Sequence, residues 1–312
     1  MKIPFRTLDM HPKGHVVGCG VQGIKCLALD LSRSRSGKWL INWSLAGELG
    51  DLEFASLLSK KTGKRHFWVS PTEEGGLQVE TSRAIEIPDG GISAKSARAD
   101  FFMTQIKSSF VNETIVTGGM RMKGPDGDDA AAKDVHNVGG GAIRDNVKRD
   151  YHSWYFKMGI RRPHIASTAL ALANAYLALY PEENRKAMPL RLVMLKGRSV
   201  YRAILMDDWR YVDEVLLPRM EGDDVNRAVI EARMNGWMDY FRRQHPSVVE
   251  EREIVPLVIA VRESHISDYE HWDLWGEYAM EKIDMTEAVA EAILSNRDMA
   301  PVAFGMALQG GC

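Results

Sequence analysis

The feature that most constrains the fold is a strand–turn–strand pattern that occurs in both halves of the chain. In the first half, residues 15–31 read HVVGCGVQGIKCLALDL, where two apolar runs flank a turn rich in glycine at Gly18, Gly20 and Gly23. Short apolar runs bounded by glycine are typical of strands. A further apolar run at 39–49 predicts a third strand, so this half opens with a β-meander.

The second half repeats the pattern over residues 190–218. Apolar and polar residues alternate along two predicted strands, and Asp207 and Asp208 provide the turn between them. Predicted helices follow the strands in both halves, which is typical of α/β lobes with a mixed sheet flanked by helices. Because the chain of 312 residues has the length of two domains, we expect a first lobe over 1–160 and a second lobe over 161–312.

Apolar residues at helical spacing recur between the predicted strands. They predict helices over residues 51–60, 93–110, 144–158, 167–180, 223–244, 286–295 and 301–311. Residues 122–134 are rich in glycine and aspartate and predict a loop. The tryptophans are expected to pack in the core: Trp39, Trp43, Trp68, Trp154, Trp209 and Trp237, with an exposed patch as the alternative for Trp272 and Trp275.

Charge, cysteine usage and hydropathy limit the class of protein. The formal net charge of −2 provides no overall field that attracts nucleic acid or an anionic membrane. Cys19, Cys26 and Cys312 are too few for a disulfide framework and predict reduced thiols. The sequence begins with charges and a proline where a signal peptide needs an apolar core. The longest uncharged apolar stretch, 165–180, is shorter than the ~20 residues that span a bilayer, so we expect a buried helix in a cytoplasmic protein.

Three segments match the motifs of one protein family in order and spacing. Residues 20–31, GVQGIKCLALDL, are similar to a phosphate loop of pattern D-I-G-x-x-S-I-K followed by an apolar strand. Residues 159–182 run from a strand into a helix containing A-L-A-N-A, and residues 296–311 are similar to a closing helix of pattern A-x-G-L-A-L-R-G. Together they resemble the PilM proteins of type IV pilus assembly, which share the actin-like ATPase superfold with FtsA.

This resemblance implies a two-lobed actin-like (ribonuclease H-like) α/β fold with a small α/β subdomain inserted into the first lobe at about 62–160. It also implies a cytoplasmic, non-catalytic scaffold of a type IV pilus-like machine. Such a scaffold docks the cytoplasmic tail of an inner-membrane partner of the PilN type and links it to the other pilus assembly components. The tail is expected in the cleft between the inserted subdomain and the first lobe, as an extended strand or a short helix.

The resemblance also locates the residues that an actin-like ATPase needs. Such enzymes hold phosphates on two glycine loops, and a carboxylate in each loop holds magnesium through water. When the first loop is aligned on Gly20 and Lys25, the family aspartate is replaced by Gly18 and the family serine by Gly23. In the second loop, of pattern D-x-G-x-x-x-[ST], the aspartate position holds Leu195.

The adenosine turn also departs from the family pattern. The resemblance places a Gly-Gly pair, which lets the adenosine approach the backbone, at Arg262 and Glu263. All three nucleotide elements are therefore changed. We expect no catalytic residue, no metal and no cofactor, and we expect ATP to bind weakly or not at all.

The remaining candidates for a ligand site are the two vestigial phosphate loops. They comprise Gly20, Gln22, Gly23, Lys25, Gly197, Arg198 and Ser199. One interpretation is that the glycines only form tight turns. The other is an anion pocket without metal, to which Lys196 and Arg262 add positive charge. A nucleotide-binding actin-like ATPase or switch protein is the alternative function, whereas a sugar kinase lacks an aspartate in a recognisable loop.

Other motifs give weaker indications. The run VGGGAI at 138–143 lacks the G-x-G-x-x-G spacing of a dinucleotide site. The nine histidines form no metalloprotease or catalytic-triad spacing. Lys60, Lys61, Lys64 and Arg65 form a basic run that is expected to be a solvated turn, with an anionic lipid or an acidic partner segment as the alternative.

Overall fold

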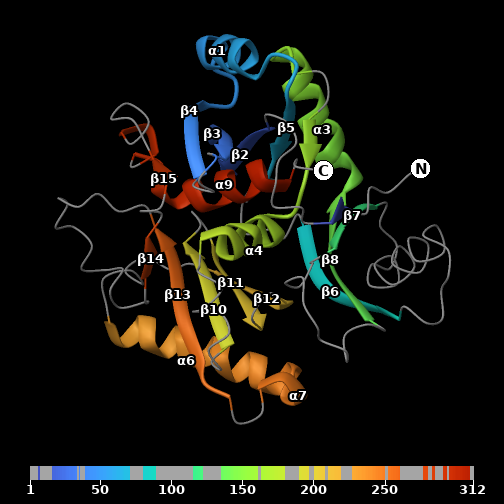
Figure 1. The fold of residues 1–312 in the computed structure, drawn as a ribbon, viewed down its shortest axis with the longest axis vertical. Helices are drawn as coiled ribbons and strands as arrows, with labels where there is room; N and C mark the ends of the chain where they lie inside the picture. Colours follow the sequence, from blue (N-terminus) through green and yellow to red (C-terminus); the bar gives the residue numbers. More distant parts are fainter. Residues whose placement is uncertain are drawn as a thin grey trace.

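The computed structural model contains three β-sheets, and helices cover the faces of two of them (Figure 1). The description covers residues 6–7, 16–33, 35, 39–70, 80–88, 115–121, 135–160, 163–179, 190–196, 200–207, 210–218, 227–249, 252–260, 277–279, 283–284, 291–293 and 295–309. The expected helix over 93–110 and the expected loop over 122–134 lie outside these residues.

The first sheet has the strand order β15-β4-β3-β2-β5-β9. Strands β2 (Val16–Gln22), β3 (Lys25–Arg33) and β4 (Trp39–Glu48) form the predicted antiparallel meander. The short strands β5 (His66–Val69) and β9 (Pro163–Ile165) extend it in parallel beyond β2. On the other edge, β15 (Ile283–Asp284) pairs in parallel with β4.

The second sheet has the order β12-β11-β10-β13-β14. Its meander consists of β10 (Leu190–Lys196), β11 (Val200–Asp207) and β12 (Arg210–Pro218), and β13 (Ile254–Ala260) and β14 (Glu277–Ala279) are parallel to β10. Both sheets therefore follow one plan, in which a meander is continued by two parallel strands beside its first strand. This doubled plan is the two-lobed actin-like (ribonuclease H-like) α/β fold, as predicted.

The third sheet has four strands, of which three fall within the expected insertion at 62–160, while the fourth, β1, comes from the start of the chain. It has the order β1-β7-β8-β6, with β1 at Arg6–Thr7, β6 at Glu80–Pro88, β7 at Ile115–Arg121 and β8 at Val135–Arg144. The inserted sheet is thus narrower than the expected 62–160, because β5 belongs to the first sheet. Strand pairing also extends the first sheet beyond residue 160, since β9 and β15 come from the region expected to form the second lobe.

The helices form an inner layer between the first two sheets and an outer layer on each side (Figure 1). The inner helices are α4 (Thr168–Leu179) and α9 (Ala300–Gln309), which pack against each other. Helices α1 (Leu52–Thr62) and α3 (Asp145–Lys157) share a core with the outer face of the first sheet. Helices α6 (Arg227–Gln244) and α7 (Pro246–Val249) cover the second sheet. A short 3₁₀ turn at Arg297–Met299 leads into α9.

Local sequence explains where these helices begin, end and lie. Helix α1 begins at Asp51, whose carboxylate accepts hydrogen bonds from the Glu53 and Phe54 amides. Helix α3 is followed by Gly159 with a φ of 84°, the conformation expected at a helix end. Helix α4 contains no charged residue and is buried almost all round, so the apolar stretch 165–180 forms a buried helix over residues 168–179, as predicted. Within the described residues, no helix is both long and apolar enough to cross a membrane.

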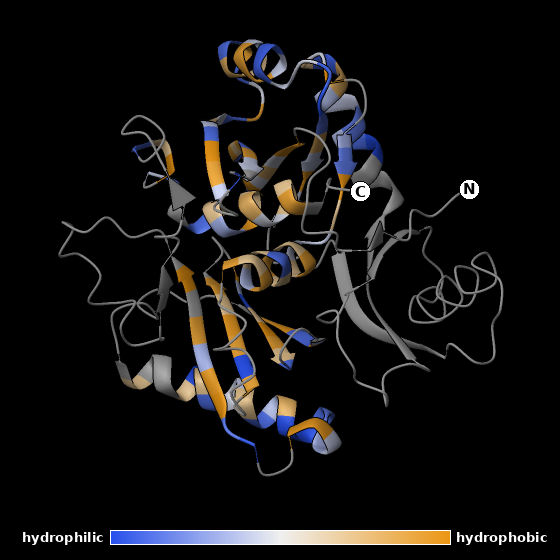
Figure 2. Ribbon diagram, viewed as in Figure 1, coloured by the Kyte–Doolittle hydropathy of each residue, from blue (hydrophilic) through white to orange (hydrophobic). Residues whose placement is uncertain are grey.

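Most of the described tryptophans lie in the core, and the apolar strands face the helix layers (Figure 2). Trp39, Trp68 and Trp237 are buried and Trp43 is partly buried, as predicted. The expectation that Trp154 packs in the core is wrong, because Trp154 is 38% exposed. It lies at the flank of α3 beside the Tyr151 ring, with a centroid distance of 5.6 Å, while the tyrosine itself fills the core. Trp209, Trp272 and Trp275 lie outside the described residues.

Candidate functional site

The first candidate loop is the β2–β3 hairpin. Its turn consists of Gly23, with a φ of 62°, and the half-exposed Ile24, and the pair Gln22 and Lys25 closes it. Gln22 is partly buried and Lys25 is exposed. A positive φ explains the glycine at position 23, because other residues rarely adopt it. The hairpin itself is therefore formed as the sequence predicts.

Gly18 and Gly20 are not part of this turn, so the expectation that they help to form it is wrong. Both lie within strand β2, opposite Leu29 and Leu27 of β3. A Cβ atom added at Gly18 would stand less than 3.0 Å from the backbone oxygen of Ala303, and also from the backbone nitrogen of Ala307. One added at Gly20 would stand 2.7 Å from the Met299 oxygen. These two glycines let helix α9 approach the strand backbone directly.

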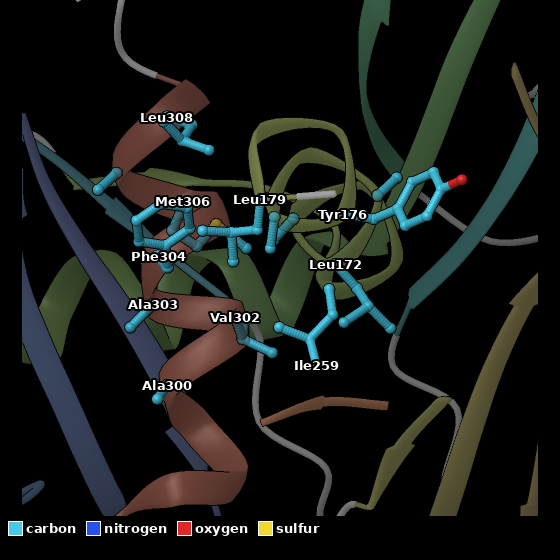
Figure 3. Close-up of a cluster of buried hydrophobic side chains, with 14 of the residues drawn as sticks. Leu172, Tyr176, Leu179, Ile259, Ala300, Val302, Ala303, Phe304, Met306 and Leu308 are labelled. Atoms are coloured by element: carbon cyan, nitrogen blue, oxygen red, sulfur yellow. The ribbon is translucent and has the colours of Figure 1, made fainter. Parts of the chain in front are cut away.

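Helix α9 makes a second contact of this kind on its other side. A Cβ atom at Gly305 would stand less than 3.0 Å from the backbone oxygen of Ala171 in helix α4. Around this contact lies a layer of buried side chains from both helices, which Figure 3 shows together with Ile259 of β13. Helix backbone and apolar side chains thus fill the space around Gly18 and Gly305 between the two sheets.

The second candidate loop follows strand β10. Leu195, at the position where the motif resemblance places an aspartate, is buried in the core between the lobes together with Val193. Lys196 ends the strand, and Gly197, Arg198 and Ser199 lie outside the described residues, as does Arg262. The structure thus places Gly20, Gln22, Gly23 and Lys25 on one hairpin, and whether the second loop completes an anion site with them stays a prediction.

Two buried polar groups near the lobe interface were not singled out by sequence. The Ser70 hydroxyl accepts a hydrogen bond of 2.9 Å from the Val21 amide, and its own amide donates to the Cys19 carbonyl. Ser70 therefore joins the ends of β2 and β5. Its only signal in the sequence is its position directly after the predicted strand HFWV.

The second group is the ion pair between Arg202 of β11 and Glu214 of β12, and both residues are buried. Arg202 lies opposite Leu195 in the strand pairing. A buried ion pair of this kind is costly to break, because removal of one partner leaves the other charge in a dry environment. It holds the two strands together on the side of the sheet that faces α4.

The buried thiols of Cys19 and Cys26 lie on the outer face of the first sheet, in the core shared with α1 and α3. The neighbouring Cys19 side chain is the largest cause of the raised pKa of Cys26, followed by burial. Burial is the main cause of the raised pKa of Tyr155, which packs beside them. A thiol with a raised pKa stays protonated and is a poor nucleophile. Among the described residues, no group of three or more His, Cys, Asp or Glu side chains is placed to hold a metal ion.

Comparison with known proteins gives a fold likeness without a sequence match. No protein-family model and no curated protein sequence matches the chain. The chain is similar to one from the PilM-PilN type IV pilus biogenesis complex, with 10% identity, a TM-score of 0.59, and coverage of 96% of this chain and 100% of that one.

Two further solved structures are more distant. The cytoplasmic domain of EpsL, an inner-membrane component of the Vibrio cholerae type II secretion system, has 10% identity and a TM-score of 0.44, with 91% of this chain and 94% of that chain covered. A Bacteroides thetaiotaomicron protein with an actin-like ATPase fold has 9% identity and a TM-score of 0.41, with 91% and 96% covered. At these identities the likeness is one of fold, and the PilM-like fold expected from the three motifs is confirmed.

Proposed function

We propose that this chain is a non-catalytic scaffold of a type IV pilus-like machine, which docks the cytoplasmic tail of an inner-membrane protein. The scaffold works at the inner face of the inner membrane and is held there by its partners. The proposal has two parts, which rest on different observations: the lack of catalysis and the docking of a tail.

The observation that carries the first part is the contact between Gly18 and helix α9. Gly18 occupies the position at which the resemblance places the magnesium-orienting aspartate, and the backbone of Ala303 and Ala307 fills the space that its side chain needs. At the second aspartate position, Leu195 is buried in the apolar layer between the lobes. At these two positions, therefore, the described residues offer no carboxylate toward a phosphate-bound metal.

This arrangement matters because catalysis of phosphoryl transfer is mostly positioning and charge stabilisation. Magnesium keeps an octahedral shell of oxygen ligands, and carboxylates orient its waters. The Leu195 side chain has no oxygen that could bind magnesium or orient its waters, and Gly18 has neither a side chain nor space for one beneath α9. We therefore expect Mg-ATP to bind weakly or not at all and not to be hydrolysed.

The second part is supported by the likeness to a chain from a PilM-PilN complex, which extends over 96% of this chain. The inserted sheet offers a surface suited to a tail, because β6, a strand of nine residues that also lies near β12, is an edge strand among the strands that the structure describes. The unpaired backbone groups of an edge strand are a template for an added peptide strand. We place the tail at this sheet and its junction with the first lobe.

Calorimetric titration with Mg-ATP and with ADP tests the first part. We expect no heat that corresponds to an affinity better than roughly millimolar. An affinity in the low micromolar range that depends on magnesium would contradict the proposal and would favour the nucleotide switch. Weak binding of phosphate without metal near Lys25 is compatible with it, because exposed lysine and turn amides are able to hold an anion.

A pull-down from solubilised inner membranes tests the second part. We expect the tagged chain to recover a protein with one membrane span, and a synthetic peptide of its cytoplasmic tail to bind the purified chain. A peptide of the same composition in scrambled order serves as the control. If crosslinked membranes yield no envelope protein, or if the scrambled peptide binds equally well, the docking proposal fails.

A further inference from the structure

Helix α1 is the outermost element at one end of the long axis of the molecule (Figure 1). One side of the helix packs onto the first sheet through Phe54 and Leu58. Leu52, the first residue of the helix, is 85% exposed, and Leu57, on a flank of the helix, is 40% exposed. At about 3.6 residues per turn these two side chains point about 140° apart, so they form two separate apolar contacts and not one apolar face. Single exposed apolar residues of this kind are common on protein surfaces.

The end of α1 also carries a dense positive charge. Lys60 and Lys61 lie in its last turn, and Lys64 and Arg65 follow directly. Among the residues that the structure describes, no carboxylate forms an ion pair with any of these four side chains. The Lys61 ammonium lies 5.2 Å from the centre of the Trp43 ring.

Local structure accounts for only part of this charge. Cations in a last turn stabilise the helix dipole, which explains Lys60 and Lys61. The acidic residues Asp51 and Glu53 stand at the opposite end, where Asp51 caps the helix. Lys64 lies beyond the helix and is exposed, so neither the dipole nor a carboxylate explains it.

We propose that the basic end of α1 binds the headgroups of an anionic lipid bilayer, through the exposed Lys60 and Lys64 supported by the partly buried Lys61 and Arg65, with Leu52 and Leu57 of the same helix as apolar contacts. A terminal, outward-facing helix suits a broad flat surface. The charge is mostly lysine, a point charge that needs no fixed geometry, whereas recognition of individual carboxylates favours the planar fork of arginine. The one arginine, Arg65, already donates a hydrogen bond to the Lys61 carbonyl.

This binding is separate from the docking of a tail. The proposed scaffold reaches the membrane through a partner, whereas α1 contacts lipid directly and adds a second, weak attachment. Two linked attachments raise the overall affinity without a new contact between proteins. Since the chain has a net charge of only −2, the attraction has to come from this local cluster.

Vesicle flotation with the purified full chain, without any partner, tests the proposal. We expect binding to vesicles of phosphatidylglycerol and phosphatidylethanolamine, no binding to pure phosphatidylcholine, and release by salt. The variant Lys60→Gln/Lys64→Gln should lower the partition coefficient roughly tenfold or more, because each cation near an anionic surface contributes severalfold. Leu52→Ser in the wild-type background should also weaken vesicle binding, but the release of the protein by salt should stay as steep as in the wild type, because no charge is removed.

The matched control is Arg242→Gln/Arg243→Gln, which removes the same charge from the exposed last turn of α6, on the far side of the molecule (Figure 1). It should leave vesicle binding unchanged, and circular dichroism should report the same fold for both variants. The proposal is overturned if the wild type does not float with anionic vesicles. It is equally overturned if the wild type binds neutral vesicles as strongly as anionic ones. The same holds if the lysine and the arginine double variants lose the same amount of vesicle binding.

Discussion

The two lobes share one strand order but meet the inner helices in different ways. In the first lobe, Gly18 and Gly20 of the central strand let the backbone of α9 lie directly on the sheet. In the second lobe, the corresponding strand β10 presents Val193 and Leu195, and a layer of side chains separates it from α4. The first contact is therefore fixed by backbone atoms and the second by side-chain volumes.

This difference determines how much change each contact tolerates. Side chains in a core adjust their rotamers, so swaps of similar volume usually cost less than about 1.5 kcal/mol. Backbone atoms of two regular elements have no such freedom, and one added carbon moves a whole helix. The first lobe thus has no room for a larger residue at Gly18, the position at which the motif resemblance places a carboxylate.

The largest expected effect is that of Gly18→Ala. Its methyl group would collide with backbone atoms of Ala303 and Ala307, so α9 would have to leave both the sheet and α4. We expect a loss of more than about 4 kcal/mol in the free energy of unfolding, which is a large part of the stability of an ordinary domain. Urea denaturation followed by circular dichroism measures this loss.

The control for this prediction is Gly236→Ala in α6. No atom lies within 4 Å of a Cβ built at that glycine. An alanine in an open helical position stabilises the helix by about 1 kcal/mol. If Gly18→Ala were as stable as the wild type, the close contact with α9 would not exist in solution, and the argument against a carboxylate at this position would fail.

The next effect concerns the buried ion pair of the second lobe. Glu214→Leu removes the carboxylate that the buried Arg202 guanidinium contacts, and we expect a loss of about 3–5 kcal/mol. The double variant Arg202→Met/Glu214→Leu should recover most of that loss, because it also removes the buried charge. A thermodynamic cycle of the three variants measures the coupling, and additive losses would show that the pair is not coupled.

A smaller effect is expected for Ser70→Ala in the first lobe. The Val21 amide would lose its hydrogen-bond acceptor in a buried place, which costs about 1–3 kcal/mol. Ser247→Ala in the exposed helix α7 is the control and should be neutral within about 0.5 kcal/mol. Chemical denaturation of both variants compares them, and equal stability of the two would contradict a structural role for the Ser70 hydroxyl.

Much of the fold could be predicted from local sequence, because strands and helices have different periods. Both meanders and the buried helix at 168–179 are found where the patterns indicate them. Strands β9 and β15 contain three and two residues, which is too short for any period to appear. They also join the first sheet from distant parts of the chain, so the expected boundary at 160 could not anticipate them.

The candidate site was harder to predict, because its decisive contacts are long-range. A glycine in a strand looks the same whether it serves a turn or the approach of a helix, and the helix that meets Gly18 is the last one of the chain. Arg202 stands in a strand where alternation suggests a solvated side chain, yet it is buried against Glu214. Sequence patterns alone do not reveal that α9 packs on Gly18 or that Glu214 pairs with Arg202, because both contacts depend on the tertiary structure.

The smallest effect appears only at alkaline pH and involves Tyr155, which lies on the outer face of the first sheet. Burial raises its pKa well above the ordinary value of 10.0, so the folded chain keeps this proton where the unfolded chain loses it. Its contribution to stability is complete below that value and is lost as the pH rises toward the folded pKa, at up to about 1.4 kcal/mol per pH unit. The Cys26 thiol acts in the same direction from its ordinary pKa of 9.0 upward.

Tyr155→Phe should therefore keep the decrease in the free energy of unfolding that begins near pH 9. It should make this decrease less steep only above about pH 10, where the tyrosine contributes. Urea unfolding of both proteins across this range measures the two slopes, and parallel curves would show that Tyr155 ionises as readily in the folded chain as in the unfolded one.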